Sequence, residues 1–336
     1  MRALITGAGG SIGCHVLRHL LANTDWDIVC LDSFRHKGLT DRIERVTVKH
    51  PETRDRLHVF THDLQAPLSP MLVKRIGHVD YILNLAAMSD VDASLEHPYF
   101  NIRANCEIML SVLEYARIVK PKAFLHVSTD EVYGPSDGTQ FHKEWDAFVP
   151  SNPYSSSKAA QEMFACGYWR AYQIPLIIVN LMNNYGEMQS TAKFPAICIR
   201  KIMQGETVTI HGSPDAIGSR FYIHSRNAAD AMLFLLKKTM PYLHEEGEVD
   251  RPDRYNVVGS ACVTNLDFAK LVAKYLDKPL FYNWSDFKAA RPGHDRSYGL
   301  DGTKLHDLGW YPPISFEESL QNTVAWYQRN KSWLDI

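Results

Sequence analysis

The sequence has little cysteine, and its cysteines follow no metal-binding or redox pattern. The six, none of which form a CxxC pair, are Cys14, Cys30, Cys106, Cys166, Cys198 and Cys262. A structural zinc site or a disulfide framework needs closer, repeated spacing. We therefore expect no metal centre, and reduced thiols in a cytoplasmic protein.

The sequence also lacks long apolar runs, an excess of one charge, and repeats. No stretch approaches the roughly 18 apolar residues that a membrane helix needs. Residues 1–6 are typical of a first strand rather than of a signal peptide. The net charge is −2, with no block of either sign. We expect neither a membrane nor a nucleic-acid partner, which still leaves room for a local basic pocket.

Short apolar runs and amphipathic stretches alternate through the first half of the chain. The β-rich runs are Arg2–Thr6, Asp27–Asp32, Leu57–Thr61, Tyr81–Asn84, Ala123–Ser128 and Leu176–Leu181. Amphipathic stretches such as Ser11–Ala22 and Asn101–Val119 lie between them, and this alternation predicts βαβ units. We therefore expect an α/β fold of the Rossmann type, in which helices cover both faces of a doubly wound parallel sheet.

The rhythm changes after Gly186, where the pattern predicts a smaller, mixed α/β C-terminal lobe. The expected elements are helices at Phe194–Gln204, Ser225–Lys238, Leu266–Tyr275 and Phe316–Asn330, and strands at Val208–Ile210 and Tyr255–Val257. We divide the chain into a first domain of residues 1–186, to which some later segments return, and a substrate-binding lobe of residues 187–336.

Three glycines directly follow the first expected strand. Gly7, Gly10 and Gly13 lie in the run GAGGSIG, and an apolar-periodic helix follows. Such a loop lets backbone N–H groups approach a pyrophosphate at a helix N-terminus, where side chains would block the approach. Asp32 ends the second strand roughly 20 residues on, where a carboxylate accepts hydrogen bonds from ribose hydroxyls. The spacing predicts a dinucleotide site, and an ordinary strand–helix turn is the alternative.

Asp32 also bears on which dinucleotide binds. Its carboxylate repels a 2′-phosphate and so favours NAD, whereas Arg35 close by leaves NADP as an alternative. Residues at the ends of the expected strands complete the candidate cofactor site, and plain packing is the alternative role for each. Together with the helix start, these candidates are Ser11, Ile12, Ser33, Asp63, Leu64, Leu85, Ala86, Ala87 and Ser128.

Tyr154 and Lys158 stand four residues apart, on one face of a helix expected to begin near Pro153. A free tyrosine, with a pKa of about 10, is a poor base at neutral pH. A neighbouring ammonium favours the phenolate, and it can also hold the ribose of a nicotinamide. The pair can then take a proton from a substrate hydroxyl while hydride leaves the same carbon. A surface helix pair is the alternative.

Five motifs, in order and at suitable spacing, resemble the extended short-chain dehydrogenase/reductases across nearly the whole chain. They are TGAGGSIG, LAA, STDEVYG, PYSSSK and NNYG. Within that family, the triplet Thr129-Asp130-Glu131 resembles the nucleotide-sugar 4,6-dehydratases, most closely those acting on dTDP-glucose. The resemblance implies a Rossmann fold, an NAD cofactor, a nucleotide-diphosphate sugar as substrate and a homodimer.

The resemblance also implies roles for the catalytic candidates. Tyr154 and Lys158 would oxidise a hexose at C4, with Thr129 hydrogen-bonded to the C4 oxygen. Glu131 would then remove the C5 proton, and a protonated Asp130 would protonate the leaving C6 hydroxyl. Hydride would return to C6 and regenerate the cofactor. Two acids on a solvated loop after a strand are the alternative interpretation.

Contacts with the nucleotide sugar follow from the same resemblance. Arg220 and Arg291 would hold the diphosphate, because forked guanidinium groups bind phosphate oxygens in pairs. Taken singly, each arginine is better explained by a surface ion pair. The other implied contacts are Ser89, Thr129, Asn184, Lys193, Asn256 and His294.

Two segments depart from the family's pattern, around Met88 and at Glu187–Lys193. They lie near the expected sugar and nucleotide pockets, so the reaction type is better supported than the base or the hexose. A 4-epimerase or a decarboxylase of a UDP-sugar is one alternative function. A non-catalytic dinucleotide-binding protein is another, although such proteins usually lose the tyrosine or the lysine.

The implied dimer would form through the helices at Asn101–Val119 and Ser155–Tyr172. Apolar residues on these two helices have two interpretations, a dimer interface or ordinary core. They are Ile108, Met109, Val112, Leu113, Met163, Phe164 and Trp169.

Overall fold

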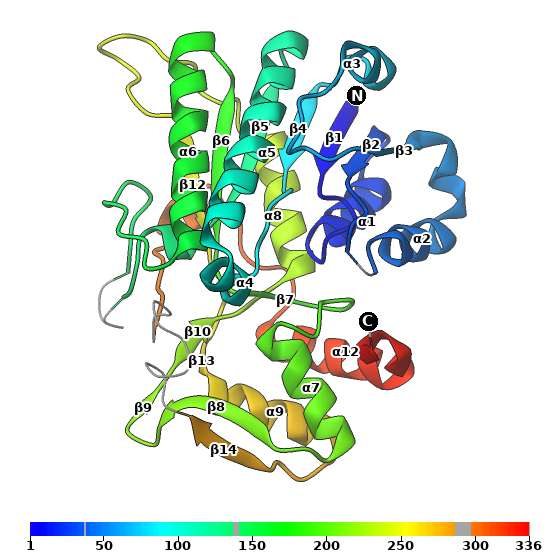
Figure 1. Ribbon diagram of the computed structural model, residues 1–336, viewed down its shortest axis with the longest axis vertical. Helices are drawn as coiled ribbons and strands as arrows, with labels where there is room; N and C mark the ends of the chain where they lie inside the picture. Colours follow the sequence, from blue (N-terminus) through cyan, green and yellow to red (C-terminus); the bar gives the residue numbers. More distant parts are fainter. Residues whose placement is uncertain (37, 137–140, 286–296, 336) are drawn as a thin grey trace.

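A computed structural model of the protein describes residues 1–336 except 37, 137–140, 286–296 and 336, and its larger lobe is built on a seven-stranded parallel sheet (Figure 1). The strand order is β12-β6-β5-β4-β1-β2-β3. The strands are β1 (Arg2–Thr6), β2 (Asp27–Asp32), β3 (Leu57–Thr61), β4 (Tyr81–Asn84), β5 (Ala123–Thr129), β6 (Leu176–Leu181) and β12 (Asp253–Val257). The order 3-2-1-4-5-6 is that of a Rossmann sheet, so the predicted fold class is confirmed.

Helices cover both faces of this sheet, and each face has its own core. Helices α5 (Pro98–Val119) and α6 (Pro153–Tyr172) pack on one face, and α1 (Gly13–Asn23) and α8 (Ser225–Lys238) on the other (Figure 1). Successive side chains of a strand point to opposite faces, which divides the apolar strand residues between the two cores. Thus Leu4 of β1 packs on the α5–α6 side.

The remaining elements of the larger lobe are short or lie at its edge. They are α2 (Leu39–Lys49), α3 (Pro70–Ile76), α4 (Val91–Glu96) and the 3-10 turns η1 (Pro51–Arg56) and η2 (Asp130–Val132). Helix α1 begins at Gly13, two residues after the predicted start at Ser11, because the glycine loop continues as a turn to that point. No helix among the described residues has the length and apolar character needed to cross a membrane.

In its described residues, the smaller lobe contains three small sheets packed against helices. Its strands are β7 (Asn184–Tyr185), β8 (Val208–Ser213), β9 (Ala216–Ile217), β10 (Ser219–Phe221), β11 (Ile223–His224), β13 (Cys262–Thr264) and β14 (Tyr282–Ser285). Its helices are α7 (Phe194–Gln204), α9 (Asn265–Leu276), α11 (Thr303–Asp307) and α12 (Phe316–Arg329), followed by the 3-10 turn η3 (Lys331–Asp335). Ring contacts among Tyr185, Tyr222 and Phe268 form the centre of this lobe.

The chain returns to the larger lobe after residue 186. Strand β12 pairs in parallel with β6, Asp253 opposite Ile177, and α8 packs beside α1. The larger lobe therefore also contains segments from beyond residue 186. The connections between the two lobes place the carboxyl ends of the central strands next to the smaller lobe. Open α/β sheets bind their ligands at these strand ends.

Candidate active site

The glycine loop is shaped by close backbone approaches. Gly7 has a φ of +68°, and a Cβ there would lie 2.9 Å from the backbone nitrogen of Ala86. A Cβ on Gly13 would lie 2.1 Å from the carbonyl oxygen of Gly7. No side chain caps the start of α1, and its first turn carries no acid. The loop therefore has the bare backbone and the positive helix end that suit a pyrophosphate.

Asp32 holds the loop from the end of β2. Its Oδ2 accepts a hydrogen bond from the backbone N–H of Gly9 at 2.9 Å, and its Oδ1 accepts from that of Phe34 at 3.1 Å. The structure thus brings Asp32 together with the glycine loop and with the adjoining Ser33. It also pairs Arg35, the cation close to Asp32 in the sequence, with the carboxylate of Asp63, which offsets the charge of Arg35.

The other predicted cofactor residues have mixed surroundings. Leu85 and Ala86 lie against the loop, and their backbone N–H groups donate to Thr6 Oγ1 at 3.2 Å. Ala87 follows them at the end of β4 and is partly exposed. Leu64 differs, because its side chain belongs to the buried core below. Ser128 is buried, and its hydroxyl has no hydrogen-bond partner among the described residues.

Two adjacent carboxyls begin the 3-10 turn at the end of β5. The hydroxyl of Thr129 donates to Asp130 Oδ1 at 2.9 Å, and the N–H of Glu131 donates to the Thr129 hydroxyl at 3.3 Å. Burial, together with the charge of Glu131, raises the pKa of Asp130 to about 7. Asn152 Nδ2 donates to Glu131 Oε2 at 3.1 Å and so favours its ionised form. The pair can therefore present one acid and one base.

Tyr154 and Lys158 reach the same place from α6, which begins with a capping box between Asn152 and Ser155. Tyr154 shares a hydrogen bond with Thr129. Burial, followed by the charges of Glu131 and Asp130, raises the pKa of the phenol. The expectation that Lys158 would lower this pKa is therefore not met in this arrangement.

Lys158 points to other partners, which explains the difference. Its Nζ donates to the carbonyl of Val127 at 2.9 Å and to Gln161 Oε1 at 2.5 Å. Burial lowers the pKa of Lys158 to about 7. Gln161 is fixed in turn by donating to the carbonyl of Asn105 at 2.6 Å. The structure thus directs the ammonium of Lys158 to partners on β5 and α6.

A fully buried ion pair lies next to the end of β5 and the helix α6. Arg254 of β12 contacts Glu162 of α6 at 2.5 Å, and neither side chain is exposed. Asn180 Nδ2 donates both to Glu162 Oε1 at 2.9 Å and to the carbonyl of Thr129 at 3.2 Å. Arg254 also donates to the carbonyl of Glu144 at 2.9 Å. These contacts tie α6 and the loop before it to the strand end that carries the acids.

On the substrate side, Lys193 and Ser89 meet. Lys193 Nζ donates to the carbonyl of Ser89 at 2.8 Å, which joins the two departing segments. Asn184 accepts from the hydroxyl of Ser225, and its amide nitrogen has no partner among the described residues. The structure thus brings Lys193 and Ser89 together and leaves the buried amide nitrogen of Asn184 without a partner among the described residues.

Arg220 and Asn256, two of the predicted substrate contacts, have different surroundings in the structure. Arg220 is buried, lies over the ring of Tyr298 with its Cζ 4.8 Å from the centroid, and its charge lowers the pKa of Asp130. Asn256 is fully buried and donates to the carbonyls of His142 and Asp301, each at 3.0 Å. The structure therefore does not place Asn256 as a substrate contact, because its amide ties loops together. Arg291 and His294 lie outside the described residues.

Glu187, in the second departing segment, is buried among cations. Its carboxylate pairs with Arg226, and Oε2 lies 3.2 Å from His224 Nε2. Burial alone would raise its pKa, but the hydrogen bond with His224 and the charges of His15 and Arg226 lower it. Nothing in the sequence pattern points to this cluster, since its members lie far apart along the chain.

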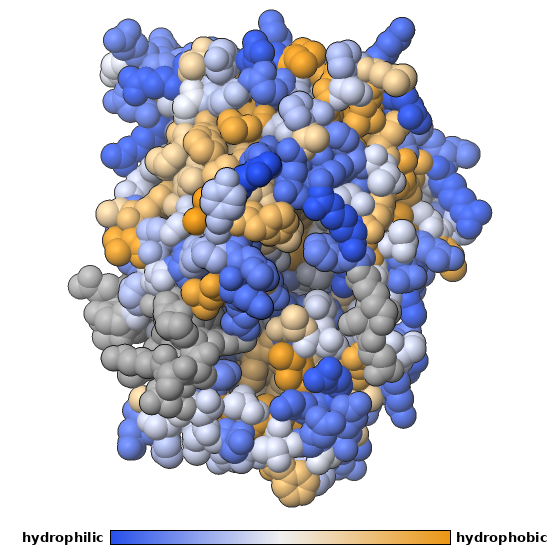
Figure 2. Space-filling model, in the orientation of Figure 1, coloured by the Kyte–Doolittle hydropathy of each residue, from blue (hydrophilic) through white to orange (hydrophobic). Residues whose placement is uncertain are grey.

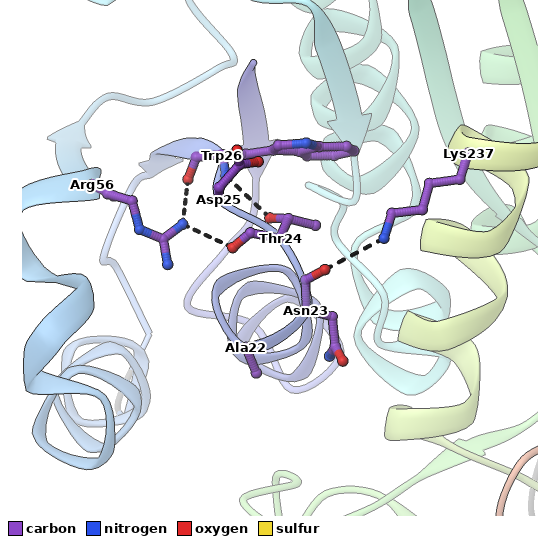
Figure 3. Close-up of a pocket in the computed structure, with 7 residues that line it drawn as sticks. All are labelled: Ala22, Asn23, Thr24, Asp25, Trp26, Arg56 and Lys237. Carbon is purple, nitrogen blue, oxygen red and sulfur yellow. Dashed lines mark hydrogen bonds between the residues drawn. The ribbon is translucent and has the colours of Figure 1, made fainter.

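A wider hollow of about 640 Å³ opens away from these residues, beside the segment before β2 (Figure 3). Arg56 donates there to the carbonyls of Leu21, Thr24 and Trp26 at 2.8–3.1 Å. Lys237 contacts the carbonyl of Asn23 at 3.4 Å. Both cations satisfy carbonyl groups at the C-terminal end of α1, which is a structural role. No group of side chains suited to a metal ion occurs among the described residues.

Comparisons with known proteins agree with this geometry. The sequence model of the family described as GDP-mannose 4,6 dehydratase matches residues 4–323. The dTDP-glucose 4,6-dehydratase 1 of Escherichia coli (strain K12) is 30% identical over 361 aligned residues, covering 100% of this chain and 95% of that enzyme.

Two solved structures are similar over the whole chain. The crystal structure of a dTDP-glucose 4,6-dehydratase from Streptomyces venezuelae, with NAD and TYD bound, has a TM-score of 0.85 at 28% identity, covering 99% of this chain and 98% of that one. A UDP-glucose 4-epimerase from Thermus thermophilus, in complex with NAD, has a TM-score of 0.83 at 24% identity, covering 98% and 99%. The second likeness concerns the fold alone.

Proposed function

The chain belongs to the GDP-mannose 4,6-dehydratase family, and from that premise we propose that it is an NAD-dependent nucleotide-sugar 4,6-dehydratase. The substrate would be an NDP-hexose resembling dTDP-glucose, and the product an NDP-4-keto-6-deoxyhexose. The observation that carries the proposal is the contrast between Asp130 and Glu131, since elimination of water needs one carboxyl of each protonation state.

The residues present fit NAD. The loop at Gly7 and Gly13 leaves no room for a Cβ, and the buried hydroxyl of Ser128 lacks a partner in the described part of the chain. Asp32 offers a carboxylate at the ribose position, and the Asp63 carboxylate already occupies Arg35. These features favour NAD over NADP, because a 2′-phosphate would face Asp32.

NAD, when bound, supplies the acceptor for a hydride from C4 and later the donor of a hydride to C6. Tyr154, which can act only as the phenolate, takes the proton of the C4 hydroxyl. Thr129 holds that oxygen, and Lys158 holds the nicotinamide ribose. Glu131 then takes the C5 proton, while Asp130 gives its proton to the leaving C6 hydroxyl. Glu131 returns its proton to C5, and the proton gained by Tyr154 replaces the one given by Asp130. The sum is the loss of one water.

Arg220 supports the choice of a diphosphate substrate. It is a buried cation within electrostatic reach of Asp130, so a diphosphate bound to it would lie close to the acids. In the described part of the chain, Asn184 offers an amide nitrogen without a partner, and Lys193 offers an ammonium that donates only to the carbonyl of Ser89. Arg291 and His294 remain proposed contacts by resemblance.

The test is incubation of the purified protein with a panel of NDP-hexoses, followed by mass spectrometry of the sugar nucleotides. Loss of one water from at least one member is the expected result. Conversion at unchanged mass would indicate an epimerase, and loss of carbon dioxide from a UDP-uronate a decarboxylase. The Tyr154→Phe variant is the matched control, since it should abolish turnover and leave the fold intact.

We also propose a homodimer formed by α5 and α6. The residues that the sequence suggests for the interface are mostly core, because Ile108, Met109, Val112, Leu113 and Trp169 are buried. Met163, which the sequence also suggests, and further apolar residues on these helices are exposed, and Figure 2 shows apolar residues gathered on the face that carries the two helices. They are Tyr99, Phe100, Ile102, Leu110, Ile118, Met163 and Tyr172.

An exposed apolar patch of this kind suits an association surface. The double variant Leu110→Glu/Met163→Glu should run as a monomer in light scattering after gel filtration, while Met71→Glu, an exposed apolar residue on α3, should not change the mass. A wild-type monomer at micromolar concentration would contradict the proposal.

A further inference from the structure

A narrow cavity of about 30 Å³ lies between α1, α2, α8, α12 and the segment after β7. Four cationic side chains line it: Arg18 from α1, Arg45 and Lys49 from α2, and Arg226 from α8. Glu187 is the one carboxylate among the lining residues that the structure describes. The cavity therefore gathers positive charge from three helices around a single buried acid.

Glu187 does not neutralise this charge. Its carboxylate is already paired with Arg226 and contacts His224 at 3.2 Å. Its backbone carbonyl accepts from His15 Nε2 at 3.0 Å, and burial lowers the pKa of His15 to about 4. The acid thus holds one arginine and leaves the other three cations of the cavity without a carboxylate.

Those three cations have weak or no partners. Arg45 donates to the amide oxygen of Asn330 at 3.0 Å and lies over the ring of Trp326. Arg18 and Lys49 form no ion pair with any described residue. Burial and the charge of Arg226 lower the pKa of Arg18, and burial with the charges of Arg18 and Arg226 lowers that of Lys49, while the charge of Glu187 raises both in part. The cations repel one another, which an anion would relieve.

We propose that this basic cavity, which lies apart from the catalytic residues, binds a phosphoryl group, either of inorganic phosphate or at the end of a larger phosphate ester. Guanidinium groups bind phosphate oxygens in pairs, and Lys49 at the exposed mouth adds a movable ammonium. About 30 Å³ accommodates only one or two waters, so one or two phosphoryl oxygens enter between the helices, while the phosphorus and any base or sugar stay at the exposed mouth. Any larger ligand must therefore keep its organic part outside.

The site is linked to both sides of the active site through residues 187–189. Arg42 donates to the carbonyl of Gly9 at 3.1 Å and to that of Met188 at 2.8 Å. Gln189 Nε2 donates to the carbonyl of Asn184 at 2.8 Å. An anion that competes with Glu187 for Arg226 acts on the segment that holds these contacts. Binding should therefore change the affinity for the nucleotide sugar as well.

The test is calorimetric titration of the full-length protein with inorganic phosphate, and separately with pyrophosphate, at constant ionic strength. NAD and an excess of dTDP are present throughout to fill the active site. The double variant Arg18→Gln/Lys49→Gln removes two cations and keeps the direct contacts of Glu187 with His15, His224 and Arg226. The matched control Arg54→Gln/Lys274→Gln removes two exposed cations elsewhere.

We expect one anion per chain in the wild type and the control, and binding weaker by about tenfold or more in Arg18→Gln/Lys49→Gln. The rise in unfolding temperature on adding phosphate gives a second measurement. Lys49→Glu alone should also make this rise smaller. Tighter binding of pyrophosphate than of phosphate indicates a phosphate ester, and the reverse indicates the free ion. Equal binding by the double variant, or none once the active site is filled, overturns the proposal.

Discussion

The side-chain amide of Asn152 donates a hydrogen bond to Glu131 Oε2 across 3.1 Å, from the residue that also caps α6. This contact joins the start of the helix that carries Tyr154 to the second of two adjacent acids. Asp130, the first, has one carboxyl oxygen without a hydrogen-bond partner among the described residues. The two neighbouring carboxyls thus have different surroundings: Glu131 accepts from a side-chain amide, whereas Asp130 accepts from the Thr129 hydroxyl at one oxygen and keeps the other without a donor in the part of the chain that is described.

The first prediction concerns Glu131. Glu131→Gln should retain oxidation at C4 but stop before elimination, because the amide cannot take the C5 proton. Turnover should fall by about 10²-fold or more, and reduced cofactor should accumulate on the enzyme. Single-turnover absorbance of the reduced nicotinamide checks this. Asn152→Ala is the companion variant, expected to slow turnover less and to cost about 1 kcal/mol through loss of the helix cap. Undiminished water loss by Glu131→Gln would refute the assignment.

The second prediction is the pH dependence that Asp130 imposes on the rate. The residue must be protonated to act as an acid, and its pKa is about 7. The kcat/KM of the wild type should therefore fall as pH rises through about 7, and Asp130→Asn should have low activity without this limb. A wild-type profile that is flat to well above this pH would argue against Asp130 as the proton donor.

Asp130 also predicts a change in stability with pH. Its folded pKa lies above the unfolded value of about 4, so the folded state binds the proton more tightly. The stability it contributes is present at low pH and is lost as pH rises through about 7. Compared with the wild type, Asp130→Asn should gain in unfolding temperature between pH 5 and pH 8. Differential scanning calorimetry at these two pH values, with Asp92→Asn as a control, measures the gain.

The third prediction concerns Asp32 and cofactor choice. The carboxylate holds the loop through Gly9 and repels a 2′-phosphate. Asp32→Asn keeps an acceptor oxygen but loses the charge, so NAD affinity should fall by about tenfold while the ratio of NADP to NAD affinity rises. Fluorescence titration with both dinucleotides measures the ratio. An unchanged ratio would mean that Asp32 does not face the ribose.

The elements that the sequence predicts well are those with local signals. The strands up to β6 are apolar runs that are largely buried, except for the edge strand β3, and their predicted bounds agree with the structure to within one residue. The glycine loop and the pair Tyr154/Lys158 are also local, since each is a short motif within one strand–helix junction or one helical turn.

The supporting residues could not be predicted, because they act across long sequence separations. Gln161 and Asn105 read as polar positions on helix surfaces, yet both are fully buried where α5 packs on α6. The sequence predicts Asn256 as a substrate contact, but its neighbours from an earlier and a later loop turn its amide inward. The partner of a buried polar group depends on tertiary packing, which no periodicity records.

The last prediction uses the ion pair of Arg254 and Glu162. Arg254→Met leaves Glu162 buried without its partner, which should cost about 3–5 kcal/mol in unfolding free energy. Arg254→Met/Glu162→Met removes both charges and should recover most of that loss, since a buried pair adds little over apolar packing. Because Asn180 links Glu162 to Thr129, the double variant should still turn over more slowly than the wild type. Urea unfolding and kcat, both measured on the wild type, the single variant and the double variant, separate the two effects. If the double variant recovers stability but its kcat stays low, the ion pair positions the active site. If it recovers both, the ion pair serves the fold alone.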